Sequence, residues 1–364
     1  MVRFNQPFLV EREHYNSYLD QIWQENWHTN NGPLLKKLEC KLASYLQIER
    51  AICVANGTLG LQIALRYLSE RTKKREIITT SFSYIATSSS ILWQNMTPVF
   101  VDISEDTLNI DHNLIGEAIT DNTAAILATH VFGNPCEIDK ISDIASEYNI
   151  PVVYDAAHCF GVEYKGKSIF HYGFASIVSF HATKLFHMVE GGGIVSNKQE
   201  FNEYALKARN FGHDGFYKYS CIGINAKCSE YHAAMGLTVL EDIDEILARR
   251  EYQYNLYVDK LNWSEKMRQQ KINSNCNIYN HSYLPVVFES FKLLNKVKMK
   301  LEDLNIETRR YFYPSLNRID SFPLGEVPIS EKVADSILCL PLHHYLDEVM
   351  ISKIAVNINL LIKE

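Results

Sequence analysis

Short runs of β-branched and aliphatic residues alternate with longer helix-patterned segments through the first two-thirds of the chain. The longer segments, such as Leu59–Leu68 and Ile138–Tyr148, repeat apolar residues at the spacing of one helix face. Alternation of this kind predicts an α/β fold with a mainly parallel sheet between helices. The predicted strands are Ala51–Ala55, Glu76–Thr80, Val99–Asp102, Ala124–His130, Val152–Asp155, Ser176–Phe180 and Gly193–Ser196.

The pattern changes in the last third of the chain. Leu237–Tyr257 is rich in charges and carries leucines at helical spacing, which predicts one long helix. Shorter, mixed elements follow, with a strand expected at His281–Phe288 and a helix at Phe291–Leu304. We therefore expect a large domain over residues 1–245 and a smaller C-terminal α/β domain over residues 246–364.

Composition excludes several classes of protein. A hydrophobic share of 46% and a charged share of 22% are ordinary for a globular protein, and the net charge of −7 argues against a nucleic-acid binder. No run of about 18 apolar residues is present and Met1–Val10 lacks the apolar core of a signal peptide, so no membrane segment is expected. The eight cysteines form no C-x-x-C pair, so we expect reduced thiols, no metal site and a cytoplasmic location.

The segment Asn56-Gly57-Thr58 follows a predicted strand and opens an apolar helix. A helix N-terminus offers unpaired N–H groups and a partial positive charge, and glycine lets a ligand approach the backbone. The segment therefore suits a phosphate, with the Thr58 hydroxyl as an added donor. A plain turn with Thr58 as the helix cap is the alternative.

Asp155 ends the hydrophobic run that begins at Val152, and His158 follows it by three residues. An acid at the end of a buried strand could hold a pyridinium nitrogen protonated, which makes such a ring an electron sink. His158 could then contact the phenolic oxygen of the same ring. The alternative is that Asp155 caps the next helix.

Lys184 lies just beyond the predicted strand Ser176–Phe180 and is followed by three glycines, Gly191–Gly193. Ser179 precedes it by five residues, where its hydroxyl could reach a phosphate. Most lysines are solvated surface charges, but this place in the sheet indicates a functional amine. The chain has no G-x-G-x-x-G, G-x-x-x-x-G-K-[ST], H-E-x-x-H or G-x-S-x-G motif, and His343-His344 has no acids at metal-ligand spacing.

Seven segments occur together in an order that resembles the DegT-type sugar aminotransferases, a branch of the fold-type I pyridoxal-phosphate enzymes. The resemblance covers about residues 30–247. Its motifs are Asn56–Thr58, Ser83–Thr87, Pro98–Ile103, His130–Pro135, Asp155–His158, Ser179–Lys184 and Gly223–Lys227.

The resemblance implies that Lys184 is the catalytic residue and binds pyridoxal 5′-phosphate covalently. It further implies that Asp155 pairs with the ring nitrogen, that His158 contacts the phenolic oxygen and that Tyr84 stacks on the ring. L-glutamate would be the amino donor, in a ping-pong reaction.

The phosphate group would be held by Gly57, Thr58 and Ser179. Asn225 matches a residue that reaches the phosphate of the neighbouring subunit, which implies a homodimer with shared active sites. Two departures from the family pattern are Leu185, where Asn is frequent, and Lys227, where Arg is usual and would hold the donor's carboxylate.

A closer resemblance, carried by Thr183–His187, Glu190–Gly192 and Thr29–Pro33, is to enzymes that aminate C4 of dTDP-4-keto-6-deoxyglucose. The residues expected to contact a substrate are Asn31, Lys227, Arg310 and Tyr311, the last two from a segment that falls where relatives touch the nucleotide diphosphate. Alternatives are a 3-keto or UDP-linked sugar, a basic helix end at Arg310, and a regulatory protein that keeps the pocket without catalysis. Dehydration of a sugar is disfavoured, because relatives of that type replace the lysine with histidine.

Overall fold

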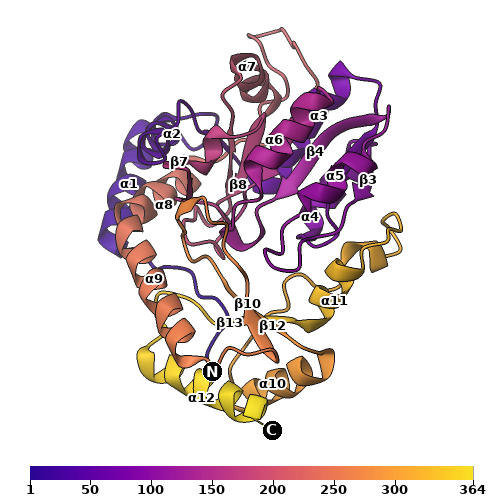
Figure 1. Ribbon diagram of the computed structural model, residues 1–364. Helices are drawn as coiled ribbons and strands as arrows, with labels where there is room; N and C mark the ends of the chain where they lie inside the picture. Colours follow the sequence, from indigo (N-terminus) through magenta and orange to yellow (C-terminus); the bar gives the residue numbers. More distant parts are fainter. Residues whose placement is uncertain (364) are drawn as a thin grey trace.

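The computed structural model describes residues 1–363 and is built around a seven-stranded sheet (Figure 1). The order across the sheet is β1 (Ile52–Val54), β9 (Gly192–Val195), β8 (Ala175–Ser179), β5 (Val152–Asp155), β4 (Thr123–Thr129), β2 (Glu76–Thr79) and β3 (Thr97–Phe100). Strands β8, β5, β4, β2 and β3 run parallel, while β9 is antiparallel to both of its neighbours. The predicted α/β class is confirmed, and each of the seven predicted strands overlaps an observed strand, although β3 begins and ends two residues earlier than predicted.

Helices cover both faces of this sheet and form two separate hydrophobic clusters. One cluster contains α2 (Pro33–Tyr45), α6 (Ile138–Glu147) and α8 (Glu230–Glu241), and the other contains α3 (Gly57–Arg71) and α7 (Gln199–Ala208). Shorter helices, α4 (Ile85–Trp93) and α5 (His112–Ala118), lie near the β3 edge (Figure 1). Every residue of β4 is buried, which explains why its sequence is continuously apolar rather than alternating.

The C-terminal part holds a three-stranded antiparallel sheet with its own core. Its strands are β10 (Met267–Gln269), β12 (Leu284–Phe288) and β13 (Ile337–Leu340), packed by α9 (Ile243–Lys260), α10 (Phe291–Asp303) and α12 (Glu348–Lys363). The remaining elements are α1 (Arg12–Glu25), α11 (Pro328–Ser336) and a small sheet of β6 (Glu163–Tyr164), β7 (Lys167–Ser168) and β11 (Cys276–Ile278). The expected division into residues 1–245 and 246–364 stays a prediction.

The single long helix expected at Leu237–Tyr257 is wrong. Helix α8 ends at Glu241, Asp242 leaves helical geometry with φ −102° and ψ 6°, and α9 starts at Ile243. Aspartate is a weak helix former, so periodicity alone does not reveal this break. The break lets α9 turn from the core of the central sheet, where Ile246 packs, to the C-terminal core, where Tyr257 packs.

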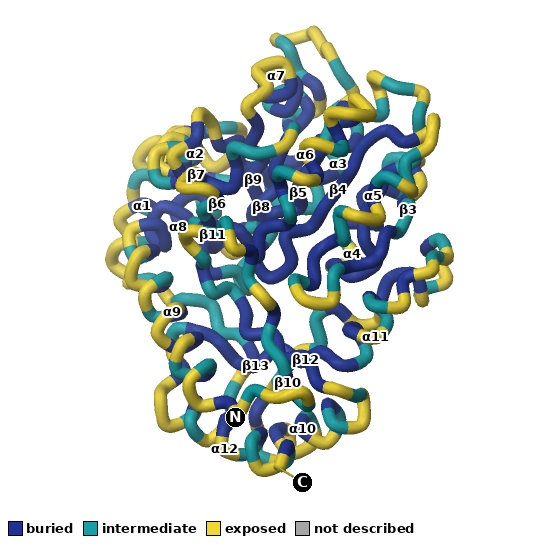
Figure 2. Tube along the Cα trace, in the orientation of Figure 1, coloured by how far each residue is buried: buried dark blue, intermediate teal, exposed yellow. Residues whose placement is uncertain are grey.

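Buried residues are concentrated in the central strands and continue to the edge where the parallel strands end (Figure 2). Because parallel strands end at one edge, the residues that follow β5 and β8 meet there. Asp155 is the last residue of β5 and Ser179 the last of β8, and Gly57 begins α3 after β1. The topology thus gathers three of the predicted site segments.

Candidate active site

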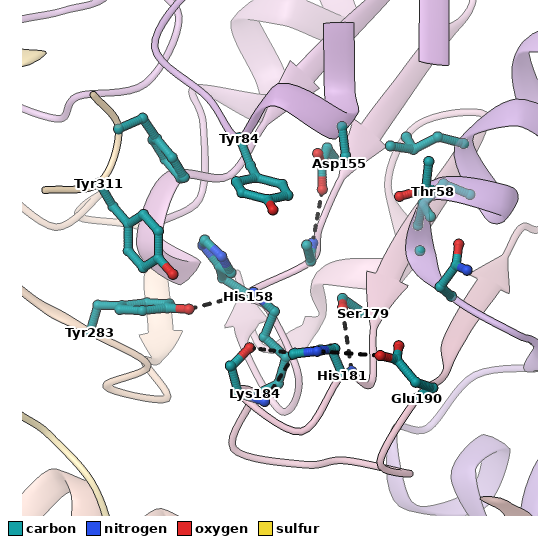
Figure 3. Close-up of a pocket in the computed structure, with 18 of the residues that line it drawn as sticks. Thr58, Tyr84, Asp155, His158, Ser179, His181, Lys184, Glu190, Tyr283 and Tyr311 are labelled. Atoms are coloured by element: carbon teal, nitrogen blue, oxygen red, sulfur yellow. Dashed lines mark hydrogen bonds and ion pairs between the residues drawn. The ribbon is translucent and has the colours of Figure 1, made fainter. Parts of the chain in front are cut away.

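A cavity of about 490 Å³ lies at this edge of the central sheet (Figure 3). Its volume is in the range of small-molecule sites. Eight of the residues expected at the site line it: Gly57, Thr58, Tyr84, Asp155, His158, Ser179, Lys184 and Tyr311. Residues from separate strands, helices and the C-terminal part therefore converge on one space.

The amine of Lys184 is buried inside the cavity. A turn after β8 positions the residue, and its backbone N–H donates to the His181 carbonyl at 2.8 Å. Burial lowers the pKa of Lys184, against the opposing effects of Tyr311, Asp155 and Tyr84. A larger share of the amine is thus neutral at ordinary pH, which a nucleophile or a general base requires.

The Asp155 carboxylate lies at the end of β5, with one oxygen accepting from Thr87 Oγ1 at 2.6 Å and the other from the Ala157 N–H at 3.1 Å. Ala157 is in a turn, so Asp155 does not cap a helix and that alternative is wrong. Burial raises the pKa of Asp155, opposed by these hydrogen bonds and by the charge of Lys184. A cation bound beside it would favour the ionised carboxylate, as a protonated ring nitrogen does.

The His158 ring is held by aromatic packing and keeps one nitrogen free. It lies parallel to Phe132 and Phe312, at interplanar angles of 1° and 6°. Its buried Nδ1 has no hydrogen-bond partner among residues 1–363. Burial and the charge of Lys184 hold the pKa of His158 well below its usual value, so a neutral imidazole faces the cavity.

The N-terminus of α3 forms one wall of the cavity. Asn56 caps it by accepting from the Leu59 N–H at 2.9 Å, so the alternative that Thr58 is the cap is wrong. Gly57 and Thr58 stand in the first turn, where backbone N–H groups lack acceptors within the helix. A Cβ on Gly192 of β9 would lie 2.6 Å from the Gly57 nitrogen, so glycine there allows the helix to approach the strand. This arrangement can bind an anion.

Asn225, Lys227 and Asn31 do not line the cavity of their own chain. Lys227 Nζ donates to Asn225 Oδ1 at 2.6 Å and lies 4.5 Å from the centre of the Phe211 ring. Burial and the charge of Arg209 lower the pKa of Lys227. The side-chain oxygen of Asn31 is buried without a hydrogen-bond partner in the described part of the chain.

Arg310 is also not among the residues that line the cavity, while its neighbour Arg309 lines it. Arg310 donates to the carbonyls of Ala334 and Asp335 at 2.9 and 3.1 Å, and its guanidinium lies 3.5 Å from the Tyr313 ring centre. It does not form a basic helix end, because its segment is a turn between α10 and α11.

Several lining residues had no assigned role in the sequence. Tyr283, Phe312 and Glu190 line the cavity, and Thr87 lies behind it on the Asp155 carboxylate. Thr87 and Glu190 fall inside motifs that were recognised as segments. Tyr283 had only its place in the predicted strand His281–Phe288 as a signal, because its approach to the site depends on tertiary packing.

Three further observations concern metals, membranes and cysteines. The described residues contain no group of three or more His, Cys, Asp or Glu side chains that could hold a metal ion. Within residues 1–363, no helix combines the length and apolarity needed to span a bilayer. All eight cysteines are free thiols.

Comparison with known proteins supports the resemblance to sugar aminotransferases. Among curated relatives, the "dTDP-4-amino-4,6-dideoxy-D-glucose transaminase" of Shigella dysenteriae is 41% identical over 344 residues, covering 93% of each chain. The enzyme of the same name from Escherichia coli is 36% identical over 361 residues, covering 96% of this chain and 95% of that one.

Solved structures agree with this comparison. The crystal structure of DesI with its TDP-sugar product superimposes with a TM-score of 0.91 at 29% identity, covering 98% of this chain and 92% of that one. The profile of the DegT/DnrJ/EryC1/StrS aminotransferase family matches residues 10–359. The chain therefore belongs to the DegT/DnrJ/EryC1/StrS aminotransferase family.

Proposed function

We propose that this transaminase depends on pyridoxal phosphate and moves an amino group from L-glutamate to C4 of dTDP-4-dehydro-6-deoxy-D-glucose. The observation that carries the proposal is the convergence of Lys184, Asp155 and the N-terminus of α3 on one cavity. Few other cofactors need a buried amine, a buried carboxylate and an anion site together. The glutamate donor and the sugar rest on family resemblance and on the names of the relatives.

The residues present fit the cofactor at each of its polar groups. Gly57, Thr58 and Ser179 would hold the phosphate, Asp155 the ring nitrogen and His158 the phenolic oxygen. The unpartnered Nδ1 of His158 and the buried carboxyl of Asp155 in the cavity wall both suit a ligand with these groups. When bound, the cofactor supplies an electron sink for the electrons left as the donor's α-carbon loses its proton.

Lys184 has two roles in this proposal. Nζ holds the cofactor between turnovers, and the free amine takes the proton from the donor's α-carbon. In the second half of the reaction it returns a proton to C4 of the sugar. Tyr84, which is 56% exposed, offers one ring face to the cavity and would orient the cofactor ring (Figure 3).

Substitution of Lys184 by alanine tests the cofactor and its covalent attachment. The variant is expected to lose protein-bound cofactor absorbance and all amino transfer, because no other lysine lines the cavity within the described residues. Lys167→Ala, at an exposed lysine of β7, is the control and should match the wild type. Turnover by the Lys184 variant would refute its role.

The sugar is proposed from the relatives, whose names point to a dTDP-linked 4-amino sugar. Other similar proteins act by name on other nucleotides, including a GDP-perosamine synthase of Escherichia coli O157:H7 at 29% identity. A panel of dTDP-, UDP- and GDP-keto-sugars with glutamate, with products identified by NMR, separates these cases. A spectral change without any amino sugar would instead favour a binding protein.

We also propose a homodimer in which Asn225 and Lys227 complete the partner's site. Both residues lie outside their own cavity, and Asn225 would reach the partner's phosphate. The loop just before them exposes Phe216 and Tyr217 at 93% and 95%, which a covering subunit would explain. We further propose that Tyr311 and Arg309 contact the sugar nucleotide, together with Asn31 of the partner.

Mixing two inactive variants tests this sharing of residues. Lys184→Ala and Asn225→Ala should each be inactive alone, but a mixed dimer has one site with an intact Lys184 and an intact Asn225 from its partner. Random mixing should then recover about a quarter of wild-type activity. No recovery, with mixed dimers shown by native mass spectrometry, would place Asn225 in its own subunit's site.

A further inference from the structure

Tyr283 places its hydroxyl beside the amine of Lys184, from the opposite part of the chain. Lys184 Nζ donates to Tyr283 Oη at 3.4 Å (Figure 3). Tyr283 immediately precedes β12 of the C-terminal sheet and is only 6% exposed. The contact therefore joins the catalytic amine of the central sheet to the start of a strand in the other sheet.

Other groups near Nζ are less suited to hold it. Asp155 is already engaged by a threonine hydroxyl and a backbone N–H, and Tyr84 and Tyr311 affect the Lys184 pKa through charge alone. His158 repels a charged amine. Tyr283 is the hydrogen-bond partner that the described residues give to this amine.

The backbone that carries Tyr283 is fixed from two sides. The buried guanidinium of Arg250 donates through Nη1 to the carbonyls of Ser282 and Leu342, at 3.0 and 3.2 Å. The Ser282 hydroxyl donates to the His158 carbonyl at 2.9 Å. Tyr283 is thus held by α9 and by the turn that carries His158, so its position relative to the cavity is set by buried contacts.

The ring of Tyr283 is equally constrained. Its centre lies 4.7 Å from that of His158 and 5.6 Å from that of Phe132, and Tyr311 packs against it at a right angle. A rotation that removed the hydroxyl from Lys184 would disturb all three contacts. The packing of the ring therefore fixes the direction of the Tyr283 hydroxyl.

A phenol beside an amine can serve both of its protonation states. It accepts a hydrogen bond from an ammonium group and donates one to a neutral amine. Burial raises the pKa of Tyr283, an effect that Cys339 and Tyr84 increase and Arg250 opposes, so the hydroxyl stays protonated at neutral pH. The same group can thus follow the amine through a proton transfer.

We propose that Tyr283 is a positioning residue whose hydroxyl orients the free Lys184 amine for proton transfer. The proposal rests on the proposed function of Lys184. When Nζ is released from the cofactor, its flexible side chain has four rotatable bonds, and one fixed partner limits where the amine can go. The hydroxyl would thus favour the geometry of proton transfer and would not contribute to substrate binding.

Tyr283→Phe tests this role, because it removes the hydroxyl and keeps the ring. Tyr257→Phe is the matched control, since Tyr257 is fully buried on α9 and its hydroxyl has no hydrogen-bond partner within residues 1–363. We expect the Tyr283 variant to lower kcat by roughly 10-fold or more while KM for the sugar changes little. The control should match the wild type.

A second measurement is independent of turnover. The full-length protein, freed of cofactor with hydroxylamine, is labelled with acetic anhydride across a pH series, and modification of Lys184 is followed by peptide mass spectrometry. Loss of the acceptor should move the midpoint for Lys184 down by roughly half to one pH unit in Tyr283→Phe. Other lysines in the same digest give internal references.

The outcomes separate the two proposals. An unchanged labelling midpoint, or an unchanged kcat, overturns the role of Tyr283. A wild-type protein that transfers no amino group to any keto-sugar overturns the proposed function instead. In that case, the labelling series still decides whether Tyr283 controls the Lys184 amine.

Discussion

Replacing Asp102 by alanine is expected to loosen α11 strongly, although the residue lies outside the active cavity. Asp102 follows β3, is 6% exposed, and accepts from the Ile329 and Ser330 N–H groups at 2.8 Å each. The Ser330 hydroxyl donates to the same carboxylate at 2.6 Å. One side chain of the central sheet thus caps a helix of the C-terminal part, at the positive end of the helix dipole.

The expected magnitude follows from these bonds. Alanine leaves two backbone donors without an acceptor at a helix end where Ser330 is buried and Ile329 half-buried, at ~1–3 kcal/mol each, while the hydroxyl can turn to another partner. The free energy of opening α11 should therefore fall by about 3–4 kcal/mol. Asp102→Asn keeps one acceptor oxygen and should cost about half as much.

Glu105 provides a matched comparison, because it also joins this region to α11. Its carboxylate meets Lys332 Nζ at 2.8 Å, and this bond lowers the pKa of Glu105. The pair is exposed, at 63% for the lysine and 46% for the acid, so Glu105→Ala should cost only ~0–1 kcal/mol. The two variants therefore compare how much a buried carboxylate and an exposed ion pair stabilise the same helix.

Hydrogen exchange of the amides in the second turn of α11, Val333–Asp335, measures this opening directly. We expect ~10²–10³-fold faster exchange in Asp102→Ala and less than a 10-fold change in Glu105→Ala. Equal effects of the two variants would refute the reasoning that buried caps dominate this contact. Unchanged exchange in both would show that α11 is held by its apolar face alone.

Two other perturbations have expected outcomes with sharp controls. Gly192→Ala would place a Cβ 2.6 Å from the Gly57 nitrogen and should weaken cofactor binding by roughly 10- to 100-fold in equilibrium dialysis, whereas Gly116→Ala, with open space around it, should leave binding unchanged. Equal binding by both variants would contradict the role of this close approach. Burial lowers the pKa of His130 from 6.5 to about 3, so His130 is protonated in the unfolded chain at a higher pH than in the folded protein. The free energy of unfolding should therefore fall by up to ~1.4 kcal/mol per pH unit as the pH drops below 6.5. His130→Asn, which can still accept from the Cys136 N–H, should make urea-unfolding midpoints less sensitive to pH between 7 and 5, and an identical slope would argue against this burial effect.

Much of the fold and part of the site could be predicted because their signals are local. The middle of β4 is a continuous apolar run, Asp155 ends such a run in β5, and Lys184 follows five residues after the end of β8. The ends of parallel strands share one edge, so sequence order was enough to place these groups in one region. The sequence determines the ends of helices less well. Periodicity predicted one helix over Leu237–Tyr257, whereas the structure has two helices separated at Asp242.

Residues that reach the site through tertiary packing carried no comparable signal. Tyr283 arrives from a different sheet, and its position depends on Arg250, whose side chain is buried against carbonyls far along the chain. Arg309 and Arg310 are neighbours in sequence, but only the backbone path of their turn decides which one lines the cavity. The sequence cannot show which of two adjacent arginines lines the cavity, because the two residues are of the same type.

The contacts around the cavity indicate which parts of it are fixed by the single chain. The Asn280 amide donates to the carbonyls of His158 and Phe160 at 2.8 Å each, so the turn after β5 is tied to the C-terminal part at several buried points. By contrast, the region of Asn225 and Lys227 is bordered by exposed aromatic residues and does not reach its own cavity. In the proposed homodimer, the cofactor ring should therefore be positioned within each subunit, whereas the partner would add Asn225 at the phosphate and Lys227 at the amino donor. Variants at the first set of contacts should change cofactor binding even in isolated subunits, and variants at Lys227 should act only in the assembled dimer.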